Sequence, residues 1–257
     1  MPELTEIEMY RRLAAPIVGR VVGVSEAPIA AYLKGGLNPG VLAGMKGRQV
    51  EDVRRIGKLL LIDLTEATLG LRFGMTGRLV IDGNAAIDEL LYTTARPDPK
   101  YRRFAMELDD GVLEIMDPRR FGSVELNPDE SILGPDALSI TTEELVQALA
   151  GSRTALKARL LDQSRVAGIG NLLCDEILWR AGLTPTREAG SITDDAVADL
   201  AQEIRSTIND MLDLGGSHMG NLQDQRSTSG VCPNDGTPLA RTSVGGRTTY
   251  WCPLHQG

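Results

Sequence analysis

The spacing of apolar residues changes once along this chain, and this change most constrains its fold. From about Val18 to Leu126, short apolar segments alternate with turns rich in Gly, Asp and Pro. Many short strands at such spacing indicate a β-sandwich. From Thr141 to about Leu214 the apolar residues recur at helical spacing. The sequence therefore predicts an α+β protein, with a β-sandwich followed by a helical domain.

Individual elements can be placed within this division. The strands expected in the sandwich are VVGVSEA, GRQVEDV, LLLIDL, LGLRFGM, RLVID, RFAMEL, GVLEIM and SVEL. A helix is expected before them, over residues 3 to 15, because apolar residues share one face and acids occupy the first turn. Further helices are expected after a Thr-Thr-Glu-Glu start, over residues 155 to 161 and over residues 172 to 181.

Length and composition are those of an ordinary globular protein. A chain of 257 residues with 42% hydrophobic content can form one large core or two to three modest units. From the changes in pattern along the chain we place three domains, at residues 1–128, 129–226 and 227–257. It contains neither an apolar run long enough to span a membrane nor a signal-peptide pattern. We expect a cytoplasmic protein that acts as a monomer.

Charge is distributed unevenly. The net charge of −8 argues against a general nucleic-acid binder, which usually carries a basic excess. The acidic residues, however, concentrate between 194 and 213, whereas clusters of Arg and Lys fall near the predicted turns of the sandwich. A locally basic groove on an acidic body is therefore possible. The acidic surface outside the groove would lower non-specific affinity for DNA.

The N-terminus carries a pair of residues suited to covalent chemistry. Removal of Met1 would leave Pro2 with a free secondary amine, and Glu3 places a carboxylate beside it. An α-amino group has a pKa of roughly 8, so a neutral, nucleophilic fraction exists near pH 7 and can form a Schiff base. The alternative is that Pro2 and Glu3 only open a helix, a role that both residue types suit.

Four internal motifs also admit a chemical role. Gly57-Lys58 predicts a hairpin tip that points the lysine into a cleft, and the alternative is a solvated turn lysine. Gly74-Met75-Thr76-Gly77 predicts a turn that holds a methionine, and the alternative is a methionine buried in the core. The motif 117–122 (DPRRFG) places arginines beside an aromatic ring that could enter a base stack, or forms an ordinary turn. A helix starting near Asn171 could bind a phosphate, or belong to a plain helical hairpin.

The tail resembles a metal ribbon. Cys232-x2-Asp235 is followed, after sixteen residues, by Cys252-x2-His255. Cysteine, histidine and carboxylate all ligate Zn²⁺, although a Cys/Asp/Cys/His set is unusual for a structural site. We expect a zinc-ribbon-like hairpin, with a metal-free ribbon as the alternative. Cys174 lies in an apolar helical stretch and is expected to be packed.

Together these motifs resemble, in order and spacing, the formamidopyrimidine-DNA glycosylase and endonuclease VIII family. The Leu4 opening and the Gly-Met-Thr-Gly turn are closer to the formamidopyrimidine branch. The resemblance implies a β-sandwich, a helix-two-turn-helix domain and a zinc ribbon that together bind double-stranded DNA with a damaged base or an abasic site. It also implies a bifunctional glycosylase and abasic-site lyase of base excision repair that flips the damaged nucleotide out of the stack.

The resemblance assigns roles to residues of this sequence. Pro2 would attack the sugar C1′, Glu3 would move protons, and Lys58 and Arg247 would contact phosphate and assist elimination. Met75, Arg119 and Phe121 would fill the hole left by the flipped nucleotide. The implied catalytic set is Pro2, Glu3, Glu6, Lys58 and Arg247. The implied DNA-binding set is Arg72, Met75, Tyr101, Arg103, Arg119, Phe121, Arg153 and Asn171, and the implied metal ligands are Cys232, Asp235, Cys252 and His255.

Several positions depart from the family pattern. Arg72 and Tyr101 stand where histidines are usual, and Asp235 and His255 stand where cysteines are usual. Only fifteen residues separate Gly216 from Cys232, where the family typically has a longer segment that covers the damaged base. We therefore expect weak discrimination of 8-oxoguanine, with ring-opened purines, oxidised pyrimidines, abasic sites or bulkier adducts as substrates. The rival hypotheses are a non-catalytic damage sensor of the same fold and an unrelated metal-ribbon protein.

Overall fold

The computed structural model describes residues 2 to 87, residue 90 and residues 98 to 257, and these form two compact units. Unit 1 comprises Pro2 and Glu6–Glu130, and unit 2 comprises Glu3–Thr5 and Ser131–Gly257. The chain thus enters unit 2 for three residues near its N-terminus and returns to it after residue 130. The boundaries of the three domains expected from the sequence stay a prediction.

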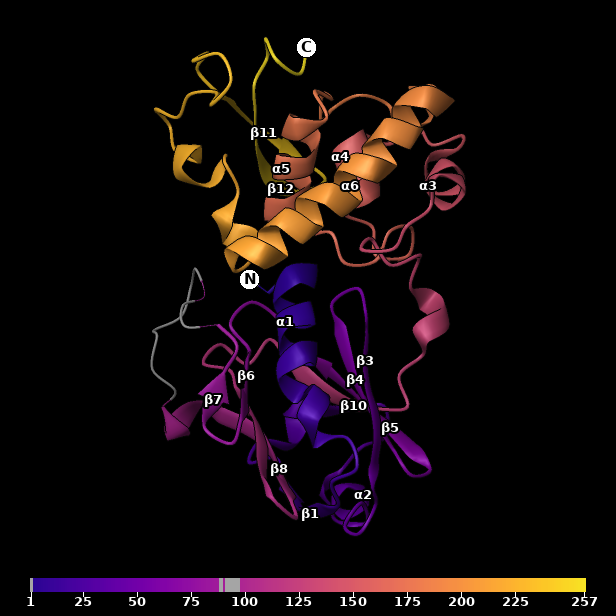
Figure 1. Cartoon of the computed structure of the whole chain (residues 1–257), viewed down its shortest axis with the longest axis vertical. Helices are drawn as coiled ribbons and strands as arrows, with labels where there is room; N and C mark the ends of the chain where they lie inside the picture. The colour runs from indigo at the N-terminus through magenta and orange to yellow at the C-terminus, as the bar shows by residue number, and fades with distance from the viewer. Residues whose placement is uncertain (1, 88–89, 91–97) are drawn as a thin grey trace. The chain divides into compact units, whose positions relative to one another are not determined.

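The described residues of unit 1 form two five-stranded sheets (Figure 1), in agreement with the β-sandwich that the strand pattern predicted. One sheet has the order β1 (Val22–Glu26), β8 (Arg102–Leu108), β9 (Gly111–Met116), β6 (Arg78–Ile81) and β7 (Asn84–Ala85). The other has the order β2 (Leu33–Lys34), β10 (Ser123–Leu126), β5 (Ala67–Arg72), β4 (Leu59–Leu64) and β3 (Val50–Ile56). All neighbouring strands are antiparallel except β2 and β10, which are parallel.

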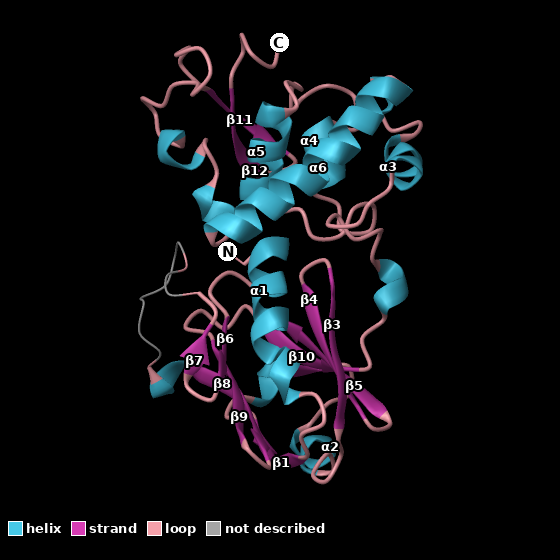
Figure 2. Ribbon diagram, in the orientation of Figure 1, coloured by secondary structure: helices cyan, strands magenta, loops and turns pink. Residues whose placement is uncertain are grey.

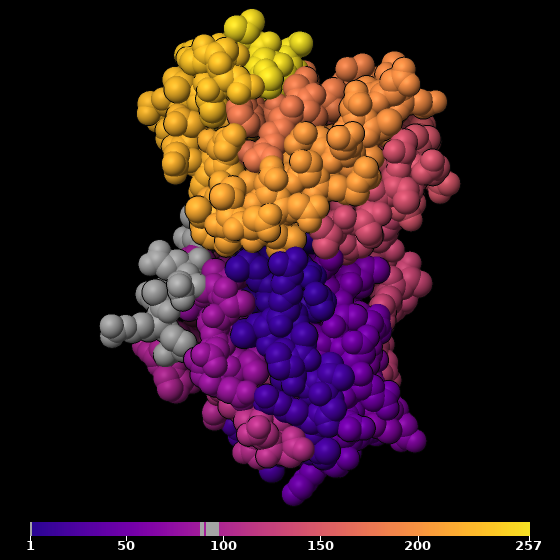
Figure 3. Space-filling model, in the orientation of Figure 1, coloured from indigo at the N-terminus to yellow at the C-terminus, as the bar shows by residue number. Residues whose placement is uncertain are grey.

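The helix α1 (Leu4–Ala14) contributes one face to the hydrophobic core of unit 1 (Figure 2). Ile7, Tyr10 and Ala14 lie on one helical face and join a buried cluster with residues of both sheets. The Tyr10 ring lies 4.7 Å from the Phe73 ring, and its hydroxyl donates a hydrogen bond of 3.1 Å to the Gly77 carbonyl. In the space-filling view the indigo side chains of α1 pack directly against those of the strands (Figure 3).

Three short elements of unit 1 were not expected from the sequence. They are β2, β7 and the helix α2 (Pro39–Ala43). Two-residue strands and a five-residue helix are too short to produce a recognisable period. The helix nevertheless has local signals, since Pro39 occupies its first turn and the Asn38 side chain accepts hydrogen bonds from the amides of Gly40 and Val41.

Unit 2 contains four α-helices and a hairpin among its described residues. The helices are α3 (Thr142–Leu149), α4 (Leu156–Leu160), α5 (Asn171–Arg180) and α6 (Asp194–Leu214), and the hairpin pairs β11 (Ala240–Val244) with β12 (Arg247–Trp251). The expected Thr-Thr-Glu-Glu start is present as a capping box, in which the Thr141 side chain and Glu144 satisfy each other's backbone amides. Gly215 ends α6 in the left-handed conformation.

The interior of unit 2 is organised around α5, which packs against α4, α6 and β12. Every residue from Leu173 to Trp179 is buried, as expected of a helix surrounded on all sides. Cys174 is fully buried among them, as the sequence suggested. Within the described parts of the chain no helix is long and apolar enough to cross a membrane.

Candidate active site

Pro2 is buried at the edge of a pocket in unit 1. The pocket has a volume of about 240 Å³ and is lined by Pro2, Ile7, Lys58, Arg72, Phe73, Gly74, Phe121 and Ser123. It therefore brings together four residues that the sequence singled out from four separate segments: the N-terminus, the β3–β4 turn, the end of β5 and the DPRRFG turn. Two of them, Lys58 and Arg72, are cationic, which suits an anionic ligand.

Lys58 stands at the tip of the β3–β4 hairpin, as predicted. Gly57 precedes it with a φ of 54°, a left-handed conformation that glycine adopts without strain. The hairpin is tied to α1 by a buried ion pair, in which Arg55 Nε lies 3.1 Å from Glu8 Oε2. Arg55 also donates a hydrogen bond of 3.0 Å to the Gly57 carbonyl. The backbone that carries Lys58 is thus held against the helix that follows Pro2.

The Glu8 carboxylate, which joins α1 to the hairpin, contacts three arginines. Arg11 and Arg12, one turn further along α1, lie 2.8 Å and 3.1 Å from Glu8 Oε1. Burial opposes ionisation of Glu8, but the hydrogen bonds and charges of Arg11 and Arg55 outweigh it and lower its pKa to about 2. The carboxylate is therefore ionised throughout the physiological range. Glu6, two residues earlier, is 1% exposed in the first turn of α1.

Three side chains expected to enter the DNA lie on two neighbouring loops of unit 1. Met75 is half-buried in the loop between β5 and β6. Arg119 and Phe121 are exposed in the loop between β9 and β10, and the Arg119 guanidinium lies 4.7 Å from the Phe121 ring centre. This cation–π contact holds the two side chains together. The 57% exposure of Phe121 is unusual for a phenylalanine and marks it as available to a partner.

The remaining candidate DNA-binding residues of unit 1 differ in how far they are exposed and in how firmly other residues hold them. Arg72 pairs loosely with Glu125, at 3.6 Å, and reaches the pocket. Tyr101 is half-buried, with the Lys100 ammonium 4.8 Å from its ring centre. Arg103, by contrast, is 6% exposed and donates hydrogen bonds of 2.9 Å to the carbonyls of Asp117 and Lys100. In this structure Arg103 supports the turn that begins at Asp117.

Glu3 lies at the N-terminus of α5 in unit 2. Its side chain is fully buried, and its two oxygens accept hydrogen bonds of 2.9 Å and 3.0 Å from the amides of Leu172 and Leu173. A carboxylate at this end of a helix satisfies free amides and interacts favourably with the helix dipole. A side chain at Gly170 would overlap Glu3, since a Cβ there would lie 2.1 Å from Cδ. The sequence signal for this partner was the Gly-rich turn before Asn171.

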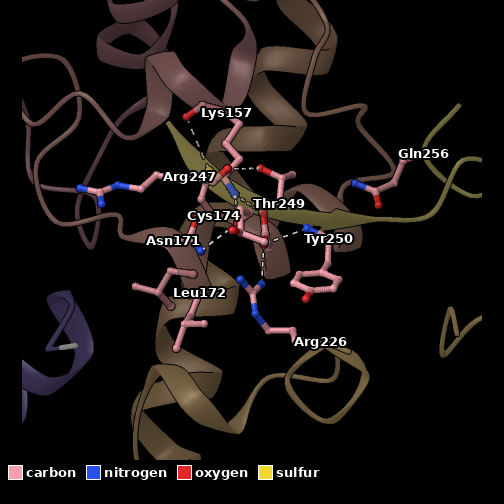
Figure 4. A network of polar contacts seen from close by, with 12 residues as sticks. Lys157, Asn171, Leu172, Cys174, Arg226, Arg247, Thr249, Tyr250 and Gln256 are labelled. Atoms are coloured by element: carbon pink, nitrogen blue, oxygen red, sulfur yellow. Dashed lines mark hydrogen bonds and ion pairs between the residues drawn. The ribbon is translucent and has the colours of Figure 1, made fainter. Parts of the chain in front are cut away.

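Asn171 lies beside a network of polar contacts that reaches the backbone next to Arg247 (Figure 4). Asn171 Nδ2 donates a hydrogen bond of 3.1 Å to the Thr248 carbonyl, which lies next to Arg247. Buried Lys157 pairs with Asp175 at 2.6 Å, and Asp175 also binds Arg226. These charges compensate one another in a closed interior, as buried ions require. The network ties the start of β12 to α4 and α5.

Arg247 itself is exposed at the start of β12, directly after the Gly245-Gly246 turn. Both glycines have positive φ, at 58° and 71°, as the turn of a tight hairpin requires. Arg153 is exposed in the loop between α3 and α4. Sequence reasoning missed the buried Lys157–Asp175 pair because its members are eighteen positions apart and lie in segments that read as ordinary helices.

The structure gathers three of the four expected metal ligands. The ligand atoms of Cys232, Asp235 and Cys252 lie within 4.8 Å of one another. His255 instead places Nε2 2.8 Å from the Trp179 carbonyl, while Trp179 Nε1 lies 3.4 Å from Cys232 Sγ. The two thiols and the Asp235 carboxylate therefore lie together as expected, and these ligand types suit zinc. The His255 imidazole lies against the Trp179 carbonyl instead.

Two family models match the chain. The formamidopyrimidine-DNA glycosylase N-terminal domain matches residues 1–124, and the formamidopyrimidine-DNA glycosylase H2TH domain matches residues 133–223. The formamidopyrimidine-DNA glycosylase of Paracoccus denitrificans (strain Pd 1222) is 34% identical over 286 aligned residues that cover 100% of both chains.

Solved structures are similar over the same extent. The structure of MutM in complex with DNA that contains carbocyclic 8-oxo-G is 27% identical, with a TM-score of 0.82 and 100% of both chains covered. The complex between the Lactococcus lactis Fpg and DNA with an abasic site is 25% identical, with a TM-score of 0.82 and 99% of each chain covered.

Proposed function

This chain belongs to the formamidopyrimidine-DNA glycosylase family, and we propose that it is a bifunctional DNA glycosylase and abasic-site lyase that reacts through Pro2. The observation that carries the proposal is the pocket that places Pro2 beside Lys58 and Arg72. A proline amine and two cations in one pocket suit a damaged nucleotide, which offers an electrophilic sugar carbon between two phosphates. DNA with a damaged base or an abasic site is the proposed partner.

The proposed reaction proceeds in balanced steps. The neutral Pro2 amine forms a bond to C1′ as the C1′–base bond breaks, and the base leaves with a proton. Opening of the sugar ring gives an iminium ion between Pro2 and C1′, with the former ring oxygen protonated as a hydroxyl. Loss of a C2′ proton then expels the 3′ phosphate by elimination, and hydrolysis of the iminium releases the enzyme.

The protein supplies the proton transfers and the positive charge. Glu3 is the proposed carrier of protons to the sugar, because it adjoins Pro2 in sequence and two backbone amides fix its carboxylate. Lys58, and Arg247 on the ribbon hairpin, are proposed to bind the flanking phosphates and to stabilise the charge of the leaving phosphate. Asn171 is the proposed phosphate ligand at the start of α5.

We propose a structural zinc ion held by Cys232, Asp235 and Cys252. Burial raises the pKa of the Cys252 thiol, so zinc would displace a proton there on binding. The ion's contribution would be to stabilise the ribbon that presents Arg247. His255 as the fourth ligand stays a prediction.

Discrimination of 8-oxoguanine is proposed to be weak, with ring-opened purines, oxidised pyrimidines, abasic sites or bulkier adducts as the preferred substrates. The segment after α6 is short, and Glu176 accepts hydrogen bonds of 3.0 Å from the amides of both Asn221 and Leu222. A segment bound in this way leaves little chain to cover a damaged base. A panel of duplexes tests this: ring-opened purine, oxidised pyrimidine or bulky adduct should be excised faster than 8-oxoguanine opposite cytosine, and the reverse order would contradict it.

Borohydride trapping on a duplex with one abasic site tests the activity itself. A covalent protein–DNA adduct should form with the wild type and be lost or strongly reduced in Pro2→Gly. Lys46→Ala, which changes an exposed lysine outside the pocket, serves as the control and should trap normally. Binding of the duplex without any adduct would instead favour a non-catalytic damage sensor.

A further inference from the structure

Asp117 is a fully buried carboxylate that joins two loops of unit 1. Its Oδ1 accepts a hydrogen bond of 2.7 Å from the Thr76 hydroxyl, in the loop between β5 and β6. Its Oδ2 accepts hydrogen bonds of 2.8 Å from the Gly122 amide and 3.3 Å from the Tyr32 hydroxyl. One side chain thus binds a group from each loop and a third group from the segment before β2.

The two loops that Asp117 joins are in direct contact. The Thr76 hydroxyl accepts a hydrogen bond of 3.3 Å from the Arg119 amide, so it links both loops through a single atom. A Cβ at Gly74 would lie 2.5 Å from the carbonyl carbon of Phe121, and a Cβ at Gly122 would lie 2.4 Å from the carbonyl oxygen of Arg72. The glycines therefore allow a backbone approach that no other residue type permits.

The side chains on these loops are the ones proposed to enter DNA. Met75 directly precedes Thr76, and Phe121 directly precedes Gly122, so each stands next to a group that Asp117 binds. Arg119 follows two residues after Asp117, and its amide binds Thr76. Asp117 is itself held by its backbone carbonyl, which accepts from buried Arg103.

We propose that Asp117 is a positioning residue that fixes the two loops as one rigid body, so that Met75, Arg119 and Phe121 enter the duplex together when the damaged nucleotide leaves it. This inference rests on the proposed function, because it assigns a cause to the insertion step of the same site. A carboxylate suits the position because it only accepts hydrogen bonds, and the three groups that face it are all donors.

The chemistry of the position predicts which substitutions matter. Asp117→Asn keeps the shape but turns an NH₂ group toward at least one donor, which leaves a buried polar group without an acceptor. Thr76→Val keeps the shape of Thr76 and removes the hydroxyl that links the loops. Thr76→Ser keeps that hydroxyl and is the matched control.

Stopped-flow fluorescence of 2-aminopurine placed next to the lesion measures insertion without requiring chemistry, and Pro2→Gly serves as the background. Asp117→Asn and Thr76→Val should slow the fluorescence change by roughly ten- to a hundredfold, the effect of a lost hydrogen bond to a charged group. Thr76→Ser should restore the wild-type rate. Equal rates in Thr76→Val and Thr76→Ser would overturn the proposal.

A second substrate separates positioning from general damage to the fold. Single-stranded DNA with an abasic site needs no insertion into a base stack, so borohydride trapping on it should be nearly unchanged in Thr76→Val. Equal losses on single and double strands would mean that the loops act only through stability, and would overturn the proposal. Failure of the wild type to trap either DNA would refute the proposed function, while the fluorescence rates would still decide the role of Asp117.

Discussion

Glu3 combines a structural contact with the chemical role proposed for it. Its buried carboxylate binds two amides at the start of α5, so the residue proposed to move protons also caps a helix. The helix-opening role considered from the sequence concerned the helix that directly follows Pro2, whereas Glu3 binds the start of a helix far along the chain. A loss of activity on substitution of Glu3 cannot be assigned to proton transfer until the stability of the variant is known.

We expect Glu3→Gln to destabilise the protein by roughly 1–3 kcal/mol, because the amide offers one acceptor oxygen to two N–H donors and leaves one buried donor unpaired. Urea denaturation measures this change in the free energy of unfolding. Glu125→Gln, at a half-buried site on β10, is a suitable control and should change the free energy little. A Glu3→Gln protein as stable as the wild type would show that the two hydrogen bonds contribute nothing.

At the scale of elements, an ion pair between Glu8 and Arg55 links the α1 helix to the β3–β4 hairpin. Glu8 and Arg55 have side chains that are 7% and 5% exposed, and Arg55 continues to the backbone of the turn that carries Lys58. Partners of such a buried pair depend on each other, since removal of one leaves an uncompensated charge.

The Glu8 carboxylate should make stability depend on pH in acid. Its pKa is about 2 in the folded protein and 4.5 in the reference state, so its contribution is fully present above pH 4.5 and is lost as the pH falls toward 2. The difference in the free energy of unfolding between wild type and Glu8→Gln should therefore grow from pH 3 to pH 5 and stay level to pH 7. A difference that is constant across pH 3 to 7 would contradict the lowered pKa.

The ribbon hairpin is the element whose stability should depend on metal. With two thiols and one carboxylate gathered within 4.8 Å, we expect Asp235→Cys to hold zinc at higher chelator concentration than the wild type, because thiolate is the stronger zinc ligand. Asp235→Asn should lose zinc at lower concentration. Zinc content per chain, measured across a chelator series, tests the order. A wild type and an Asp235→Asn protein with equal zinc content would exclude Asp235 as a ligand.

At the scale of the whole molecule, the protein must bind a polyanion while carrying a net charge of −8. Binding therefore has to rely on a few local cations. Each phosphate contact should contribute about 0.9 to the slope of log K against log salt concentration. Lys58→Ala and Arg247→Ala should each lower the magnitude of that slope by about this amount, as measured by fluorescence anisotropy, and Lys46→Ala should leave it unchanged. Equal slopes in all four proteins would show that neither residue contacts phosphate.

Much of the fold could be predicted from the sequence because its signals are local. The long strands such as β4 and β9, the capping box at Thr141 and the start of α5 each follow from a few adjacent residues. The partners of buried polar groups could not be predicted in this way. Tyr32 and Asp117 are 85 positions apart, and no spacing rule connects them.

The candidate site likewise contains residues that local motifs identify and residues that only distant contacts identify. Its turn residues, such as the half-buried Lys58 and the exposed Phe121, could be found from turn motifs. The groups that hold them, such as Glu8 and Asp117, read as ordinary members of a helix and a turn. The orientation of His255 was also beyond the sequence. It depends on the Trp179 carbonyl, which a helix elsewhere in the chain supplies.

The central claim is that the Pro2 amine forms the covalent bond to DNA, and peptide mapping of the borohydride-trapped complex tests it most directly. After nuclease and protease digestion, mass spectrometry should find the reduced sugar remnant on the peptide that begins with Pro2, with Met1 absent. A remnant on a peptide that contains Lys58, or on any other lysine, would contradict the account.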